Sequence, residues 1–75
     1  MGAISTEAAR QIVVDFIKQK KRIERIEVST VENKNGCWVV RGTCPIDLDG
    51  HPWAEKFEVI LNQKGKIKST EFALL

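Results

Sequence analysis

The chain has 75 residues, of which 43% are hydrophobic and 29% charged, and 12 basic against 10 acidic side chains give a net charge of +2. A chain of this length folds as one small domain, residues 1–75, without room for a deep pocket under a separate lid. The charge is too balanced to predict nucleic-acid binding by itself. No apolar run comes near the ~20 residues of a membrane-spanning helix.

The first ten residues, MGAISTEAAR, lack the basic and apolar regions of a secretion signal. The sequence has only two cysteines, and without such a signal we expect them to be kept reduced. We therefore expect a cytoplasmic protein.

Residues 6–21 are predicted to form an amphipathic helix. Ser5 can accept a hydrogen bond from the first turn, and Glu7 suits the positive end of the helix dipole. Apolar side chains at helical spacing form one stripe, which consists of Ala9, Ile12, Val13, Phe16 and Ile17.

Residues 23–74 are predicted to form an antiparallel sheet. The first strand, within residues 23–32, needs one bulge near Ser29-Thr30 to bring its apolar residues onto one face. Asn35-Gly36 is a strong hairpin signal, because both residues tolerate positive φ. The return strand, CWVVRGTC, is expected to end at Pro45.

Residues 47–52 are expected to form a loop, and strands at residues 53–62 and 67–74 follow it. The register of this last hairpin stays open. A two-residue loop places Phe57 opposite Phe72 and Val59 opposite Thr70, whereas a three-residue loop places Leu61 opposite Ile67.

The predicted fold class is α+β, with one N-terminal helix packed on a four-stranded antiparallel meander (α-β-β-β-β). Neighbouring strands joined by short connections pair with each other. The helix stripe should cover the sheet face that carries Trp38, Val40, Phe57 and Val59.

The stretches GCWVVRG and KFEVILNQKGKI resemble small PepSY-type and cystatin-like modules, and are similar to a gas-vesicle accessory family. The resemblance covers about half the chain and implies the helix-plus-four-strand fold. The cystatin inhibitory motif Q-x-V-x-G is missing, so the resemblance does not imply protease inhibition. The residues that match are Trp38, Val40, Phe57, Glu58, Val59, Leu61 and Gly65.

The two cysteines are not expected to form a site. Seven residues along a strand span about 23 Å, and an odd offset puts two side chains on opposite faces. Cys37 and Cys44 therefore can neither bridge nor share a metal.

His51 near Asp47 and Asp49 is expected to be an exposed histidine rather than a catalytic base. The run Asp47 to Gly50 resembles a calcium loop, but His51 and Pro52 occupy the positions of the third ligand and the glycine. We expect no catalytic, cofactor or metal site, and no enzyme activity.

One basic cluster closes the predicted helix. Positive charge there offsets the negative end of the dipole, and it also offers a surface for the phosphates of RNA or DNA. The candidate anion-binding residues are Lys18, Lys20, Lys21, Arg22 and Arg25.

The sheet face away from the helix is half apolar, which favours an interface with another protein or with a second copy. The candidate interface residues are Cys37, Val39, Arg41, Thr43, Ala54 and Ile60. We therefore expect a protein-interaction module that binds a partner or forms a homodimer, through this face or an edge strand. Binding of an anionic polymer is the alternative, and a small-ligand carrier is a third class.

Overall fold

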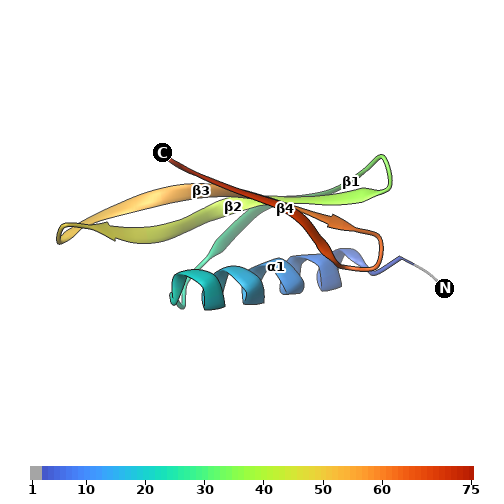
Figure 1. The fold of residues 1–75 in the computed structure, drawn as a ribbon, viewed down its shortest axis with the longest axis horizontal. Coiled ribbons are helices and arrows are strands. Elements are labelled where there is room, and N and C mark those ends of the chain that lie inside the picture. The colour runs from blue at the N-terminus through green and yellow to red at the C-terminus, as the bar shows by residue number, and fades with distance from the viewer. Residues whose placement is uncertain (1–2) are drawn as a thin grey trace.

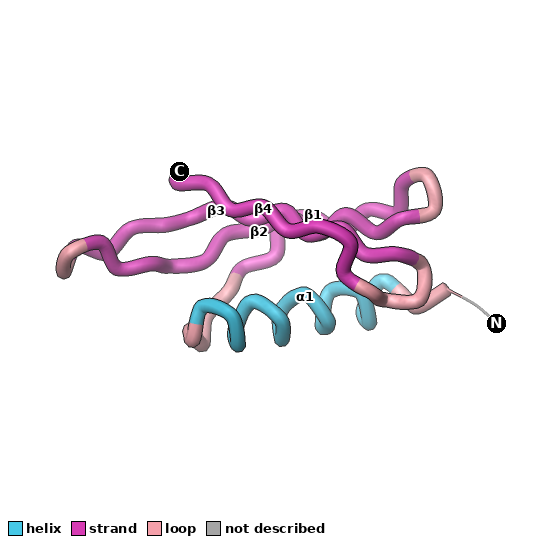
Figure 2. Tube along the Cα trace, in the orientation of Figure 1, coloured by secondary structure: helices cyan, strands magenta, loops and turns pink. Residues whose placement is uncertain are grey.

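The computed structural model describes residues 3–75, so Met1 and Gly2 of the predicted domain lie outside the described residues. One helix precedes a four-stranded antiparallel sheet with the strand order β1-β2-β3-β4. The predicted α+β class and its α-β-β-β-β order are confirmed. Figure 1 shows α1 along one face of the sheet, and Figure 2 shows the strands on one side of it. The elements are α1 Thr6–Lys21, β1 Glu27–Lys34, β2 Cys37–Leu48, β3 His51–Asn62 and β4 Ile67–Leu74.

The helix has the predicted bounds because both ends are capped. Ser5 Oγ accepts a hydrogen bond from the Ala8 amide at 3.1 Å. At the other end Arg22 adopts the left-handed conformation, with φ of 56°, and its amide bonds the Lys18 carbonyl oxygen. With only 16 residues, and an alternation of polar and apolar positions, α1 is neither long nor apolar enough to cross a membrane.

The hydrophobic core lies between the helix stripe and the inner face of the sheet, which is the face toward α1. Ala9, Val13 and Ile17 are completely buried. Ile4 and Ile12 pack at the margin of the cluster. The residues that the sheet contributes to this core are Trp38, Val40, Cys44, Phe57, Val59 and Leu61.

Two bulges set the register of the sheet. The predicted bulge in β1 is confirmed between Val28 and Thr30. A second register shift between Ile60 and Leu61 reconciles the two alternatives for the last hairpin. Phe57 pairs with Phe72 as the two-residue loop requires, and Leu61 pairs with Ile67 as the three-residue loop requires.

The prediction that Pro45 ends the second strand is wrong, and so is the predicted loop at residues 47–52. β2 runs on to Leu48, and β3 begins at His51. The Ala54 carbonyl accepts a hydrogen bond from the Leu75 amide, so the polar groups of Ala54 point toward β4. Its partner Pro45 therefore points to the opposite, unpaired edge, where the missing N–H removes no ladder bond.

The same alternation places the nitrogen of Pro52, which pairs with Asp47, at the free edge of β3. Asp49 and Gly50 form a two-residue turn with φ of 51° and 82°. The first strand also starts later than expected, at Glu27 rather than at residue 23.

The long β2–β3 hairpin projects from the body of the molecule. β1 pairs with β2 only as far as Thr43, and β4 reaches only Glu55 on β3. We name residues 45–54 the arm. The arm extends past the end of α1 (Figure 1) and contributes to an overall extent of 47 × 19 × 17 Å. The radius of gyration is 12.7 Å, against about 11 Å for a compact domain of this length.

Candidate protein interface

The six candidate interface residues all lie on the outer face of the sheet, away from α1. Their positions alternate with the core residues of β2 and β3, and Val39 pairs directly with Ile60. Arg41 is exposed, whereas Cys37, Thr43, Ala54 and Ile60 are half-buried. Val39 has only 8% of its surface exposed, so it adds little to the surface that a partner can contact.

The centre of this outer face is hollowed. A concavity of about 790 Å³ crosses all four strands near the first bulge and Gly42. Hydroxyl groups and charges of both signs line it, so the hollow has a mixed polar character. Its polar lining includes Thr30, Arg41, Thr43, Lys56, Glu58 and Glu71.

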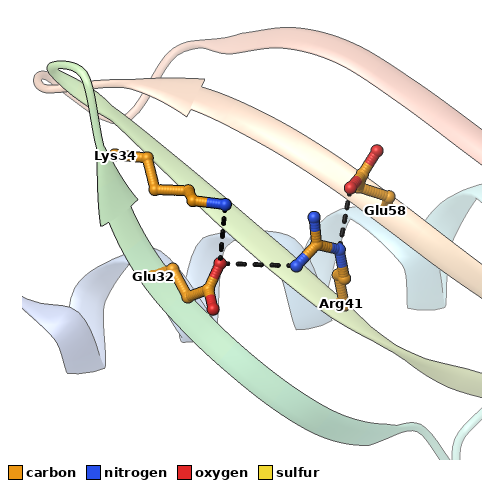
Figure 3. A network of polar contacts seen from close by, with 4 residues as sticks. All are labelled: Glu32, Lys34, Arg41 and Glu58. Atoms are coloured by element: carbon orange, nitrogen blue, oxygen red, sulfur yellow. Dashed lines mark hydrogen bonds and ion pairs between the residues drawn. The ribbon is translucent and has the colours of Figure 1, made fainter.

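An ion-pair network lies beside this hollow and joins three strands (Figure 3). Arg41 donates through Nε to Glu58 Oε2 at 2.8 Å and through Nη1 to Glu32 Oε1 at 3.3 Å. Lys34 Nζ lies 3.6 Å from the same oxygen of Glu32. All four side chains are at least one-third exposed, and such pairs contribute about 0–1 kcal/mol each. The network orients the charged rim of the face more than it stabilises the fold.

The basic cluster is divided by the fold. Lys18, Lys20, Arg22 and Arg25 are exposed, and none of them forms an ion pair within residues 3–75. Lys21 differs, because it folds back onto the sheet.

The ammonium of Lys21 lies between an acid and an aromatic ring. Nζ is 2.9 Å from Glu55 Oε1 and 4.3 Å from the centre of the Phe72 ring. That oxygen is buried and no donor is aligned to hydrogen-bond it, so proximity of charge alone compensates it. Both the ion pair and the cation–π contact hold the end of α1 on β3 and β4. Sequence reasoning missed this role, since it depends on the packing of the helix.

The two cysteines are free thiols on opposite faces of β2. Cys37 is half-buried on the outer face, with its Sγ 3.6 Å from Lys68 Nζ. Cys44 is buried in the core, 2% exposed. Burial raises the pKa of the Cys44 thiol above its ordinary value of 9.0, and Glu55 raises it further while Lys21 opposes the shift.

We expect these environments to separate the two thiols in alkylation. N-ethylmaleimide at neutral pH should modify Cys37 first and Cys44 only as the chain unfolds, because the buried thiol is protonated and shielded. Mass spectrometry of partly modified protein checks the order. Equal rates at the two sites would contradict the burial of Cys44.

The raised pKa of Cys44 also predicts a pH dependence of stability. The folded state holds this proton more tightly than the unfolded state, so its contribution is complete below pH 9.0 and is lost as pH rises toward the folded pKa. The free energy of unfolding, measured with urea, should therefore depend on pH in the same way for wild type and Cys44→Ala below this pH. Above it, the wild type should lose stability more steeply with pH than Cys44→Ala does.

The side chains with catalytic potential are not brought together. His51 and Asp49 lie at the arm tip, and His51 is exposed. Cys44 lies four ladder pairs away from His51, about 13 Å along the strand. Within residues 3–75 no three His, Cys, Asp or Glu side chains are grouped as metal ligands would be.

A feature that the sequence analysis missed is the apolar inner surface of the arm. Ile46, Leu48 and Trp53 occupy the same face as Cys44 and Glu55, as their pairing shows. The signal was present: alternating apolar residues flank Asp49-Gly50, which is a hairpin pattern. This hairpin was not predicted because Pro45 was expected to end the strand.

Comparison with known proteins finds no protein-family model, no curated protein and no solved structure that matches this chain.

Proposed function

We propose that the protein is a small, non-enzymatic interaction module of the cytoplasm that binds another protein through the outer face of its sheet. The observation that carries the proposal is the bare outer face itself, where half-buried apolar residues and a hollow of about 790 Å³ adjoin a charged network. Protein interfaces combine an apolar centre with a polar rim in this manner. The resemblance to PepSY-type and cystatin-like modules stays a prediction.

Self-association is the homomeric form of the same proposal, through the outer face or through an edge. The body of the sheet has edges at β1 and β4, whose outward backbone groups are open to strand addition. The arm differs, because Pro45 and Pro52 place their nitrogens at its two free edges. Edge pairing is therefore restricted to the body.

Thr43→Arg is the experiment that tests the outer face. Thr43 is half-buried in the lining of the hollow, so the larger cation should fill the space that a partner enters. Immobilised wild type should capture a partner from an extract of the source cells. The amount captured by Thr43→Arg should be lower by at least about tenfold, an effect of the size seen when a central interface contact is removed.

The control for this experiment is Gln19→Arg, which adds the same side chain at an exposed position on α1. It should capture the partner as the wild type does. Equal capture by wild type, control and Thr43→Arg contradicts the outer face as the binding site.

Binding of RNA or DNA by the helix end is the second candidate. The observation in its favour is that Lys18, Lys20, Arg22 and Arg25 are exposed together at one end of α1. Two observations weaken it. Lys21 is occupied by Glu55, and the acidic arm tip projects from the same end of the molecule (Figure 1). We therefore favour the protein partner.

A further inference from the structure

The inner face of the arm is apolar yet uncovered. Leu48 is 42% exposed, Trp53 51% and Leu74, which pairs with Glu55 at the base of the arm, 54%. With Leu75 these are the large apolar side chains that are exposed within residues 3–75. We name Ile46, Leu48, Trp53 and Leu74 the arm stripe. A gathering of this kind at one end of a small domain marks an interaction surface.

The helix stops before it reaches this surface. α1 ends at Lys21, whose ion pair with Glu55 lies at the base of the arm. After the helix the chain continues to β1, and Ile23 in this loop is the residue that approaches the arm. The small hollow that Ile23 shares with the arm is lined by Pro45, Ile46, Asp47, Gly50 and Pro52. No other described element lies over the inner face beyond this point, as Figure 1 shows.

Charges of opposite sign lie at the two ends of the arm stripe. The exposed carboxylates of Asp47 and Asp49 are at the tip. Four exposed cations lie at the base, in the last turn of α1 and just after it, namely Lys18, Lys20, Arg22 and Arg25. Asp47 leaves the arm on its outer side, but the tip is only two strands wide. Its charge acts across that width, since the Debye length is about 8–10 Å at physiological salt.

We propose that a second copy of this chain packs on the arm stripe, with the two arms antiparallel and face to face about a two-fold axis. Each stripe then covers the other, and the acidic tip of each copy lies against the basic helix end of its partner. The four ladder pairs of the arm span about 13 Å, so a reversed arm brings its tip near the base of the other.

A second copy is the occupant that the charges favour. An anionic bilayer or a nucleic acid complements the helix end, but the tip carboxylates repel both. A face contact is also favoured over strand addition at the arm, because both of its edges present a proline nitrogen. An isologous contact requires one surface that is complementary to itself, and the arm stripe with its two charged ends is such a surface.

Reciprocal charge reversal tests this proposal. In one variant, Asp47→Lys is combined with Asp49→Asn, since asparagine keeps the left-handed turn at φ of 51°. In the other, Lys18→Glu is combined with Arg25→Glu. Each variant alone should dimerise at least about tenfold more weakly than the wild type in sedimentation experiments. An equimolar mixture should dimerise more tightly than either variant alone, because one tip-to-base contact of the mixed dimer is the wild-type pair and the other no longer places like charges together.

Lys64→Glu combined with Lys66→Glu is the matched control. It makes the same change in net charge as Lys18→Glu with Arg25→Glu, but in the β3–β4 turn at the opposite end of the molecule, and should dimerise as the wild type does (Figure 1). Thr43→Arg should also dimerise normally, which separates this contact from the proposed outer-face interface. Circular dichroism of each variant establishes that it is folded.

Three results would overturn the proposal. The first is a wild-type chain that stays monomeric at all concentrations, and the second is a dimer that ignores both charge reversals. The third is a monomer whose helix end binds an RNA oligonucleotide, with that binding lost in Lys18→Glu, Arg25→Glu. This last result would assign the basic end to nucleic acid instead.

Discussion

Replacing Gly42 with alanine is expected to lower the free energy of unfolding by about 3 kcal/mol, the upper end of the usual range for overpacking. A Cβ at this position would lie 2.1 Å from the Glu27 carbonyl oxygen and 2.9 Å from Val28 Cα, both backbone atoms of β1. It would also lie 2.7 Å from Phe57 Cζ in the core. A side-chain rotation cannot relieve the two backbone contacts, so β1 must move away from β2.

The close approach at Gly42 follows from the neighbouring bulge in β1. Val28 pairs with Gly42 immediately before the register shift, where a bulged strand bends and its twist increases. Gly36→Asn is a matched control, because a Cβ there meets no atom within 4 Å and asparagine tolerates the φ of 76°. Its cost should stay below about 1 kcal/mol. Urea unfolding followed by tryptophan fluorescence measures both, and an unchanged midpoint for Gly42→Ala would contradict the observed approach of β1.

Ile17→Ala is expected to cost about 2–5 kcal/mol, the range for truncating a fully buried aliphatic side chain. Ile17 has no exposed surface and packs in the cluster between α1 and the sheet. A domain of this length has a total stability of roughly 4–11 kcal/mol. The substitution thus removes a large part of what holds the helix on the sheet.

The control for Ile17→Ala is Gln19→Ala, two residues along the same helix at an exposed position. It should change stability by no more than about 0.5 kcal/mol. Thermal unfolding followed by far-ultraviolet circular dichroism gives both values. Similar midpoints for the two variants would mean that α1 contributes little through this face, contrary to its burial.

The parts of the fold that sequence predicts are those with local causes. The helix bounds follow from the Ser5 cap and the apolar stripe, and the β1 bulge follows from parity within one strand. The bulge between Ile60 and Leu61 was not predicted. Each of the two predicted registers assumed a regular ladder. In the structure the register changes once, so that Phe57 and Phe72 pair as in one register and Leu61 and Ile67 pair as in the other.

The arm was missed for a different physical reason. Proline breaks a ladder only where its nitrogen points at a partner strand, and that direction depends on the register with β3. The hydrogen bond from the Leu75 amide to the Ala54 carbonyl shows this direction, and these two residues are 21 positions apart in the sequence. No local pattern contains that information.

The sequence predicts which side of the sheet carries the candidate interface residues, but it does not predict the hollow on that side. Alternation along β2 and β3 placed six residues on the outer side, and their pairing confirms this placement. The hollow beside Arg41 and the burial of Val39 arise from twist and bulging of the whole sheet. The role of Lys21 likewise depends on where α1 ends relative to Glu55.

The meander order β1-β2-β3-β4 has a consequence for how the chain folds. Every pair of adjacent strands is joined by a short turn, so each ladder can close from its own turn with little loop entropy. The β2–β3 ribbon has the most pairs and a two-residue turn, and we expect it to nucleate the sheet before α1 docks. Substitutions in its ladder should slow folding, whereas Ile17→Ala should mainly accelerate unfolding in stopped-flow measurements.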